Sequence, residues 1–103
     1  DLMSHLRYDA DLEFIGEGCN PYYIRLQTYD RPGILGQITS TFGVYGISIK
    51  TMMQQALNSE DGTVPLIFIV HDVEKSILKT ALDVLIQNQS VASVDNVLRV
   101  LNS

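Results

Sequence analysis

The feature that most restricts the fold is the order in which segments with a strand-like apolar pattern and segments with a helix-like apolar pattern follow one another along the chain. Four segments have the alternation or the apolar, β-branched composition of strands: Tyr22–Tyr29, Ile47–Ala56, Val64–His71 and Ser93–Leu101. Two segments between them repeat apolar residues at helical spacing: Ile34–Phe42 and Ile77–Ile86. The sequence therefore predicts the order strand, helix, strand, strand, helix, strand.

This order predicts one α+β architecture. Each strand–helix–strand crossover prefers the right-handed path, which places both helices on the same face of one sheet. The expected fold is a ferredoxin-like βαββαβ sandwich with a four-stranded antiparallel sheet. Tyr22–Tyr29 and Val64–His71 should be the central strands, and Ile47–Ala56 should lie at an edge.

Glycine and polar residues mark where the predicted elements end. Gly43 and Gly46 should end the first helix, and Asn58–Gly62 should form a turn. Asp72 is placed to cap the second helix. The last strand should have two faces, with Val94, Leu98 and Val100 on one and Val97 and Leu101 on the other.

Size and charge limit the classes of partner. The 103 residues suffice for one compact domain, and 46% of them are hydrophobic, which argues against disorder. The net charge of −5 disfavours nucleic acid and anionic membrane surfaces, which both attract Lys and Arg. The longest apolar run, Leu66–Val70, is too short to span a bilayer. The single cysteine, Cys19, cannot form an internal disulfide, so we expect a reducing, cytoplasmic location.

The chain divides into a tail and a module. Residues 1–21 are expected to be the tail of an upstream catalytic domain plus a linker, because glycine, asparagine and proline cluster before Tyr22. Residues 22–103 form the expected module. The sequence starts at Asp1 rather than at a methionine, so we expect catalytic residues to lie outside it.

No pattern of catalytic residues emerges. The two histidines, His5 and His71, are far apart in the sequence and lack zinc-ligand spacing. They also suggest no Ser/His/Asp arrangement. Gly16-Glu17-Gly18 follows no strand and opens no helix, unlike a dinucleotide-binding loop. We therefore expect no active site, no metal and no cofactor in this chain.

Two RNA-binding modules share parts of the pattern. Gly33-Ile34-Leu35-Gly36 matches the short loop motif of KH domains, but Arg31 is the only nearby cation. The RNA-recognition module has the same element order and needs aromatic and basic residues on its third strand. Val64–Val70 offers one aromatic residue and no cation, so a nucleic-acid role is disfavoured.

The strongest candidate site comprises two segments. They contain Asp30, Arg31, Pro32, Gly33, Ile34 and Leu35, and after the helix Gly46, Ile47, Ser48 and Ile49. One interpretation is a tight turn into a helix, with Pro32 in its first turn and Asp30 capping it. The other is a site for an anion or zwitterion. Free N–H groups at a helix start, here those of Gly33, Ile34 and Leu35, favour a carboxylate, and Gly33 allows close approach to the backbone.

These two segments resemble the signature of the ACT domain family over about Tyr22–Leu101. The flanking strings Tyr22–Leu26, Ile47–Gln55 and Val64–His71 resemble the C-terminal regulatory domain of bacterial homoserine dehydrogenases. Leu2–Tyr8 resembles the last helix of the dehydrogenase body. The resemblance implies an NAD(P)-dependent parent enzyme, with NADP as its expected cofactor and an upstream dehydrogenase domain as a partner.

Three functions stay open at this point. The resemblance implies a module that senses an amino acid, with threonine expected, and regulates the attached dehydrogenase. A second hypothesis is an ACT domain that only dimerises the enzyme, through a sheet edge or face. A third is an ACT domain of another pathway, such as that of phosphoglycerate dehydrogenase with serine. In the first two we expect a homodimer joined near Ile47–Ala56, because an open sheet edge tends to pair.

Overall fold

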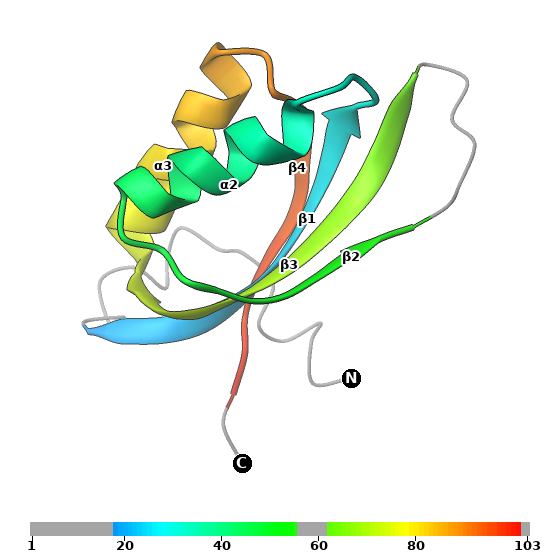
Figure 1. Ribbon diagram of the computed structural model, residues 1–103. Helices are drawn as coiled ribbons and strands as arrows, with labels where there is room; N and C mark the ends of the chain where they lie inside the picture. Colours follow the sequence, from blue (N-terminus) through cyan, green and yellow to red (C-terminus); the bar gives the residue numbers. More distant parts are fainter. Residues whose placement is uncertain (1–17, 56–61, 102–103) are drawn as a thin grey trace.

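The computed structural model describes residues 18–55 and 62–101, which form one sheet covered by two helices (Figure 1). The elements are β1 (Cys19–Tyr29), α2 (Ile34–Val44), β2 (Ile49–Gln54), β3 (Thr63–Glu74), α3 (Lys75–Gln87) and β4 (Val91–Arg99). The sheet order is β2-β3-β1-β4 and all three pairings are antiparallel. The predicted ferredoxin-like fold is confirmed, with β1 and β3 central and β2 at an edge.

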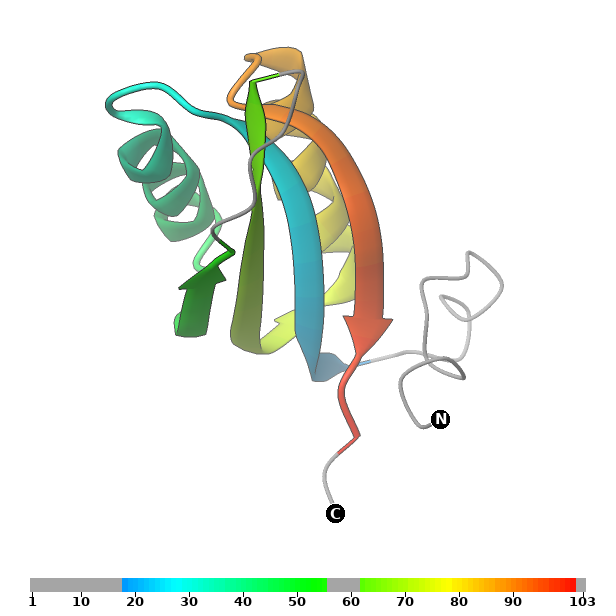
Figure 2. The ribbon, with the colours of Figure 1, turned by 90° about the vertical axis from the view of Figure 1, so that its right-hand side faces the viewer.

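Both helices lie on the same face of the sheet, and no helix of residues 18–55 and 62–101 covers the opposite, open face (Figures 1 and 2). The alternation in β1 explains this arrangement. Ile24, Leu26 and Thr28 are buried beneath the helices, whereas Arg25 and Gln27 lie on the open face and are half-buried. One strand thus supplies the core with one set of residues and the open face with the other.

The core is centred on an aromatic pair. Phe42 from α2 and Phe68 from β3 are fully buried, with ring centroids 5.4 Å apart and planes at 86°, an edge-to-face arrangement. The apolar stripe of α3 packs on the same cluster. Its buried members are Leu78, Ala81, Leu82 and Leu85, and the two flanking members of the predicted stripe, Ile77 and Ile86, are partly exposed.

The central strands are longer than the sequence predicts, because they continue to pair with each other at their far ends. β1 begins at Cys19, which pairs with Glu74, so residues 19–21 belong to a strand and not to the predicted linker. β3 likewise continues through Asp72, so the predicted cap is wrong and Glu74 occupies the N-cap position of α3. The tail prediction for residues 1–17 lies outside the described residues.

The other strands are also shifted. β2 begins at Ile49, two residues after the predicted start at Ile47, and its predicted end at Ala56 lies outside the described residues. β4 begins and ends two residues earlier than predicted.

The predicted faces of β4 are wrong because the strand contains irregularities in its pairing. Ile24 pairs with Val97 and Leu26 with Val94, so one extra residue separates these partners on β4. The extra residue is a β-bulge, which puts two residues opposite one and reverses the alternation. Val94 and Val97 therefore both pack on the core, and Leu98 lies on the other face beside Tyr23.

We predict that Phe42→Ala lowers the free energy of unfolding by about 3–5 kcal/mol, because it removes a fully buried ring and leaves a cavity. Val44→Ala, on the same helix at 82% exposure, should change it by no more than about 0.5 kcal/mol. Urea denaturation of both variants measures the difference. Equal losses would show that α2 does not pack as described.

Candidate functional site

The turn between β1 and α2 is shaped by a left-handed glycine. Gly33 has φ 84° and occupies the N-cap position of α2. Before it, the Asp30 N–H donates to the Gly62 carbonyl at 3.2 Å, and the Arg31 N–H donates to the Tyr29 carbonyl at 3.0 Å. Pro32 lies in the turn, two residues before the helix begins at Ile34, and not in the first helical turn as predicted. These two bonds hold the backbone that leads into Gly33.

The start of α2 presents free N–H groups. The Ile34 N–H donates to the Arg31 carbonyl at 3.2 Å, so Ile34, one of the predicted carboxylate donors, is already occupied. The N–H groups of Gly33, Leu35 and Gly36 have no acceptor in residues 18–55 and 62–101. Gly36 is therefore a donor that the sequence analysis missed. Three outward N–H groups at a helix start are suited to a carboxylate.

Space and charge around Gly33 agree with this chemistry. A Cβ built on Gly33 or on Gly36 meets no atom within 4 Å, so the backbone is open to a ligand. The Asp30 carboxylate is exposed and has no hydrogen-bond partner among the described residues. Its predicted capping role is not observed, since the N-cap position is Gly33 and has no side-chain bond. Asp30 remains available for an ammonium group.

The Arg31 side chain contacts two groups outside the start of α2. Its Nη2 donates to the Gln89 carbonyl at 3.0 Å, and its guanidinium lies 5.5 Å from the centre of the Tyr29 ring. A guanidinium within about 6 Å of an aromatic ring centroid is attracted by the electron-rich face of the ring. Arg31 therefore connects the turn to the segment between α3 and β4.

The second predicted segment lies at the other end of α2. The 11 residues of this helix span about 16 Å, and Gly46–Ile49 follow its last turn. Ile47 is buried and its N–H donates to the Phe42 carbonyl at 2.8 Å, while the Ser48 carbonyl accepts from the His71 N–H at 2.8 Å. The structure thus does not bring the two predicted segments together within one chain.

β2 is the exposed edge beyond this segment. It pairs with β3 on one side, and its residues from Lys50 to Gln54 are all exposed. Met53 has 54% of its surface exposed. The apolar exposed side chains of β2 are Met52 and Met53, and the strand also carries the charged Lys50. An exposed edge strand is a typical place for another chain to pair.

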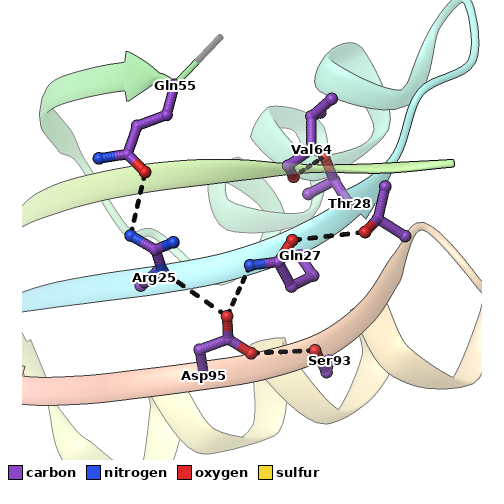
Figure 3. A network of polar contacts seen from close by, with 8 residues as sticks. Arg25, Gln27, Thr28, Gln55, Val64, Ser93 and Asp95 are labelled. Atoms are coloured by element: carbon purple, nitrogen blue, oxygen red, sulfur yellow. Dashed lines mark hydrogen bonds and ion pairs between the residues drawn. The ribbon is translucent and has the colours of Figure 1, made fainter. Parts of the chain in front are cut away.

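A polar network crosses the open face of the sheet, and the sequence analysis missed it (Figure 3). Arg25 Nη1 donates to Gln55 Oε1 at 3.1 Å, and Arg25 Nε lies 3.6 Å from Asp95 Oδ2. Gln27 Nε2 donates to the same Asp95 oxygen at 2.7 Å, and Ser93 Oγ donates to the other at 3.0 Å. Asp95 is the residue that the irregularity in β4 inserts. The side chains satisfy one another, which fits a structural role across strands.

A groove of about 460 Å³ lies between α3 and β4, away from the β1–α2 turn. Its lining is largely apolar with charged residues among it: Lys75, Lys79, Leu82, Asp83, Ile86, Val94, Asp95, Asn96 and Val97. Its volume is in the range of small-molecule sites. No sequence motif indicated it, because its two walls come from separate elements.

Other chemical groups are sparse in the part of the chain that the structure describes. Those residues contain no cluster of three metal-ligating side chains and no helix long and apolar enough to cross a membrane. Burial raises the pKa of Tyr22, and the nearby Arg99 partly opposes this. Tyr22 pairs with Arg99 at the end of β1 opposite the turn, so its titration lies far from Gly33.

With this geometry established, comparison with known proteins identifies the family. The model of the ACT domain family matches residues 22–88. The chain belongs to the ACT domain family. The matched residues include both the turn at Gly33 and the edge strand β2.

Curated relatives of this ACT domain are homoserine dehydrogenases. The chain is 40% identical to the enzyme of Pseudomonas aeruginosa over 58 residues, which cover 55% of the chain and 13% of the enzyme. It is 30% identical to the enzyme of Synechocystis over 81 residues, which cover 79% of the chain and 18% of the enzyme. The similarity thus spans less than a fifth of either dehydrogenase.

Solved structures with the same fold include a homoserine dehydrogenase and another ACT domain. A homoserine dehydrogenase from Thiobacillus denitrificans superposes with a TM-score of 0.69 at 27% identity, covering 82% of this chain and 18% of that one. The ACT domain of a GTP pyrophosphokinase from Chlorobium tepidum superposes with a TM-score of 0.58 at 24% identity, covering 76% and 97% of the two chains. The second likeness supports the fold alone.

We predict opposite effects of alanine at two neighbouring glycines. Gly33→Ala should lower the free energy of unfolding by about 1–2 kcal/mol, because alanine resists a φ of 84°. Gly36 lies within α2, and a Cβ there also meets no atom within 4 Å. Gly36→Ala should therefore raise the free energy of unfolding by about 0.5–1 kcal/mol. Thermal and urea unfolding measure both, and a stabilised Gly33→Ala would contradict the left-handed turn.

Proposed function

We propose that this ACT domain binds a free amino acid and thereby regulates a homoserine dehydrogenase to which it is attached. The observation that carries the proposal is the open start of α2, where Gly33, Leu35 and Gly36 present unpartnered N–H groups. The family and the similarity to homoserine dehydrogenases support the regulatory role. The similarity also favours this pathway over that of phosphoglycerate dehydrogenase.

The proposed ligand pose divides an amino acid between two chains. Its carboxylate accepts from the N–H groups at the start of α2, and Asp30 attracts its ammonium. Since Gly46–Ile49 lie about one helix length away in the same chain, a second chain must supply them. The exposed Ser48 hydroxyl of that second chain can then form a hydrogen bond with a small polar side chain of the ligand. Threonine is the ligand we propose on this basis.

The regulation that we propose is a binding linkage. An effector controls an enzyme only if it binds one enzyme state better than another, typically by about 1–3 kcal/mol. The ACT domain contributes binding and no chemistry. We propose that NADP and the catalytic residues belong to the upstream dehydrogenase domain, and that the whole protein is cytoplasmic.

A dimerisation-only role is the second candidate, and the exposed edge of β2 favours it. In this case the domain joins two enzyme subunits without reading an amino acid. Both candidates require a dimer, so only ligand binding separates them.

We predict that threonine binds the wild-type chain in isothermal titration, and that Gly33→Val weakens this binding at least tenfold. The new side chain would occupy the open approach to the N–H groups. Gly18→Val is the matched control, since Gly18 has a φ of 83°, equally open surroundings and a place at the far end of β1. It should suffer the same backbone strain and bind threonine normally.

Serine, lysine, methionine and NADPH complete the titration series. Absence of binding by any amino acid at millimolar concentration would leave dimerisation as the function. Saturable NADPH binding would refute the assignment of the cofactor to another domain. Unchanged affinity in a folded Gly33→Val would move the site elsewhere.

We predict a homodimer in solution that depends on β2. Met53→Lys should dissociate it, because it removes an exposed apolar side chain and adds a second charge to an edge strand that already carries Lys50. Leu101→Lys replaces an apolar residue of similar exposure, 48% against 54%, beyond the end of β4 and should leave the dimer intact. Sedimentation velocity at high micromolar concentration measures the mass, and a monomeric wild type would contradict the two-chain site.

A further inference from the structure

The turn at residues 88–90, between α3 and β4, lies beside the β1–α2 turn at one end of the sheet (Figures 1 and 2). Two side-chain hydrogen bonds join the two turns. Arg31 Nη2 donates to the Gln89 carbonyl at 3.0 Å, and Ser90 Oγ donates to Gln37 Oε1 at 2.7 Å. Arg31 and Gln37 lie on either side of Gly33 along the chain. The donors at the start of α2 are therefore bracketed by contacts to residues 88–90.

The backbone of Arg31 is hydrogen-bonded on both sides of its side chain. The Arg31 N–H bonds to the Tyr29 carbonyl, and the Arg31 carbonyl accepts from the Ile34 N–H. The guanidinium lies 5.5 Å from the centre of the Tyr29 ring, which limits the directions that it can take. Any movement of the turn at Gly33 therefore moves the group that holds the Gln89 carbonyl.

The Ser90 contact is buried. Ser90 is fully buried, and Gln37 is the partner of its hydroxyl. Breaking this bond would leave a hydroxyl without a partner in the interior, which is unfavourable. Gln37 is in the first turn of α2, and its N–H bonds to the Gly33 carbonyl at 3.0 Å. Gln37 thus connects Ser90 to the helical turn whose N–H groups are the proposed ligand donors.

The turn that receives these contacts is strained. Gln89 has a φ of 62° and is the one non-glycine residue with positive φ in the described part of the chain. Left-handed backbone at such a residue persists only when its surroundings hold it. Asn88 Oδ1 accepts from the Ser90 N–H, and the Gln89 N–H donates to the Ile86 carbonyl, while Arg31 and Gln37 supply the contacts from outside the turn.

We infer that Arg31 and Gln37 are positioning residues that couple occupancy of the amino-acid site to the α3–β4 turn. The inference rests on the proposed function, since the ligand donors are those at the start of α2. Two states are involved: a latched turn, as in this structure, and a released turn in which Gln89 leaves the left-handed region. A carboxylate on the N–H groups of Leu35 and Gly36 holds the first turn of α2 in place and favours the latched state.

The consequence extends to the groove between α3 and β4. Residues 88–90 join α3 to β4, the two walls of the groove described above. From this turn β4 runs the length of the sheet to Arg99. A change at the latch therefore alters a second surface without any ligand contact there.

Amide hydrogen exchange tests the latch in the free protein. Arg31→Ala and Gln37→Ala should each accelerate exchange of the Gln89 and Ser90 N–H groups at least tenfold. Both amides are otherwise protected by bonds to the carbonyls of Ile86 and Leu85. Lys79→Ala removes an exposed cation from α3 and is the matched control, with no change expected. Unchanged exchange in both latch variants would overturn the inference, whether or not an amino acid binds.

Amide hydrogen exchange in the presence of threonine tests the coupling between the ligand site and the α3–β4 turn. Threonine should slow exchange at Gln89 and Ser90 at least threefold in the wild type and in Arg31→Lys, which keeps a donor for the carbonyl. The Arg31→Ala/Gln37→Ala double variant should still bind threonine, within tenfold of wild type, but without this slowing. Full slowing in the double variant would refute the coupling. A wild type that binds no amino acid refutes the proposed function, while the free-protein exchange still decides whether the latch exists.

Discussion

The antiparallel pairing of β1 with β3 is the interaction on which the remaining structure depends. This ladder runs from Cys19 and Glu74 at one end to Tyr29 and Thr63 at the other. It places the apolar residues of both strands under the helices and brings the Gly62 carbonyl to the Asp30 N–H. The turn at Gly33 and the edge strand β2 are therefore both attached to the same rigid pair of strands.

The separation of the two signature segments follows from this framework. A helix that crosses the sheet face must carry the chain from one end to the other, so the segments before and after α2 lie about 16 Å apart. A site that uses both segments has to involve two chains. Within one chain, the start of α2 is instead connected to residues 88–90, through Arg31 and Gln37.

Periodicity predicted the element order, the central strands and the edge strand, because burial on one face imposes alternation on residues such as Ile24, Leu26 and Thr28. It failed where backbone pairing departs from regularity. The extra residue Asp95 reverses the faces of β4, and no single-sequence period reports a bulge. The motif located the turn and two of its three free donors, Gly33 and Leu35. It was wrong for Ile34, because the hydrogen bond from this N–H to the Arg31 carbonyl exists only in the folded turn, and it did not include Gly36.

The central claim is that the start of α2, and not the groove between α3 and β4, recognises an amino acid. Titration of threonine into ¹⁵N-labelled protein, followed by backbone amide NMR, tests it most directly. The largest direct shifts should occur at the amides of Gly33, Leu35 and Gly36, the three groups without acceptors among the described residues. Largest shifts at groove residues such as Lys79, Ile86 and Asn96, with the α2 start unchanged, would contradict the account.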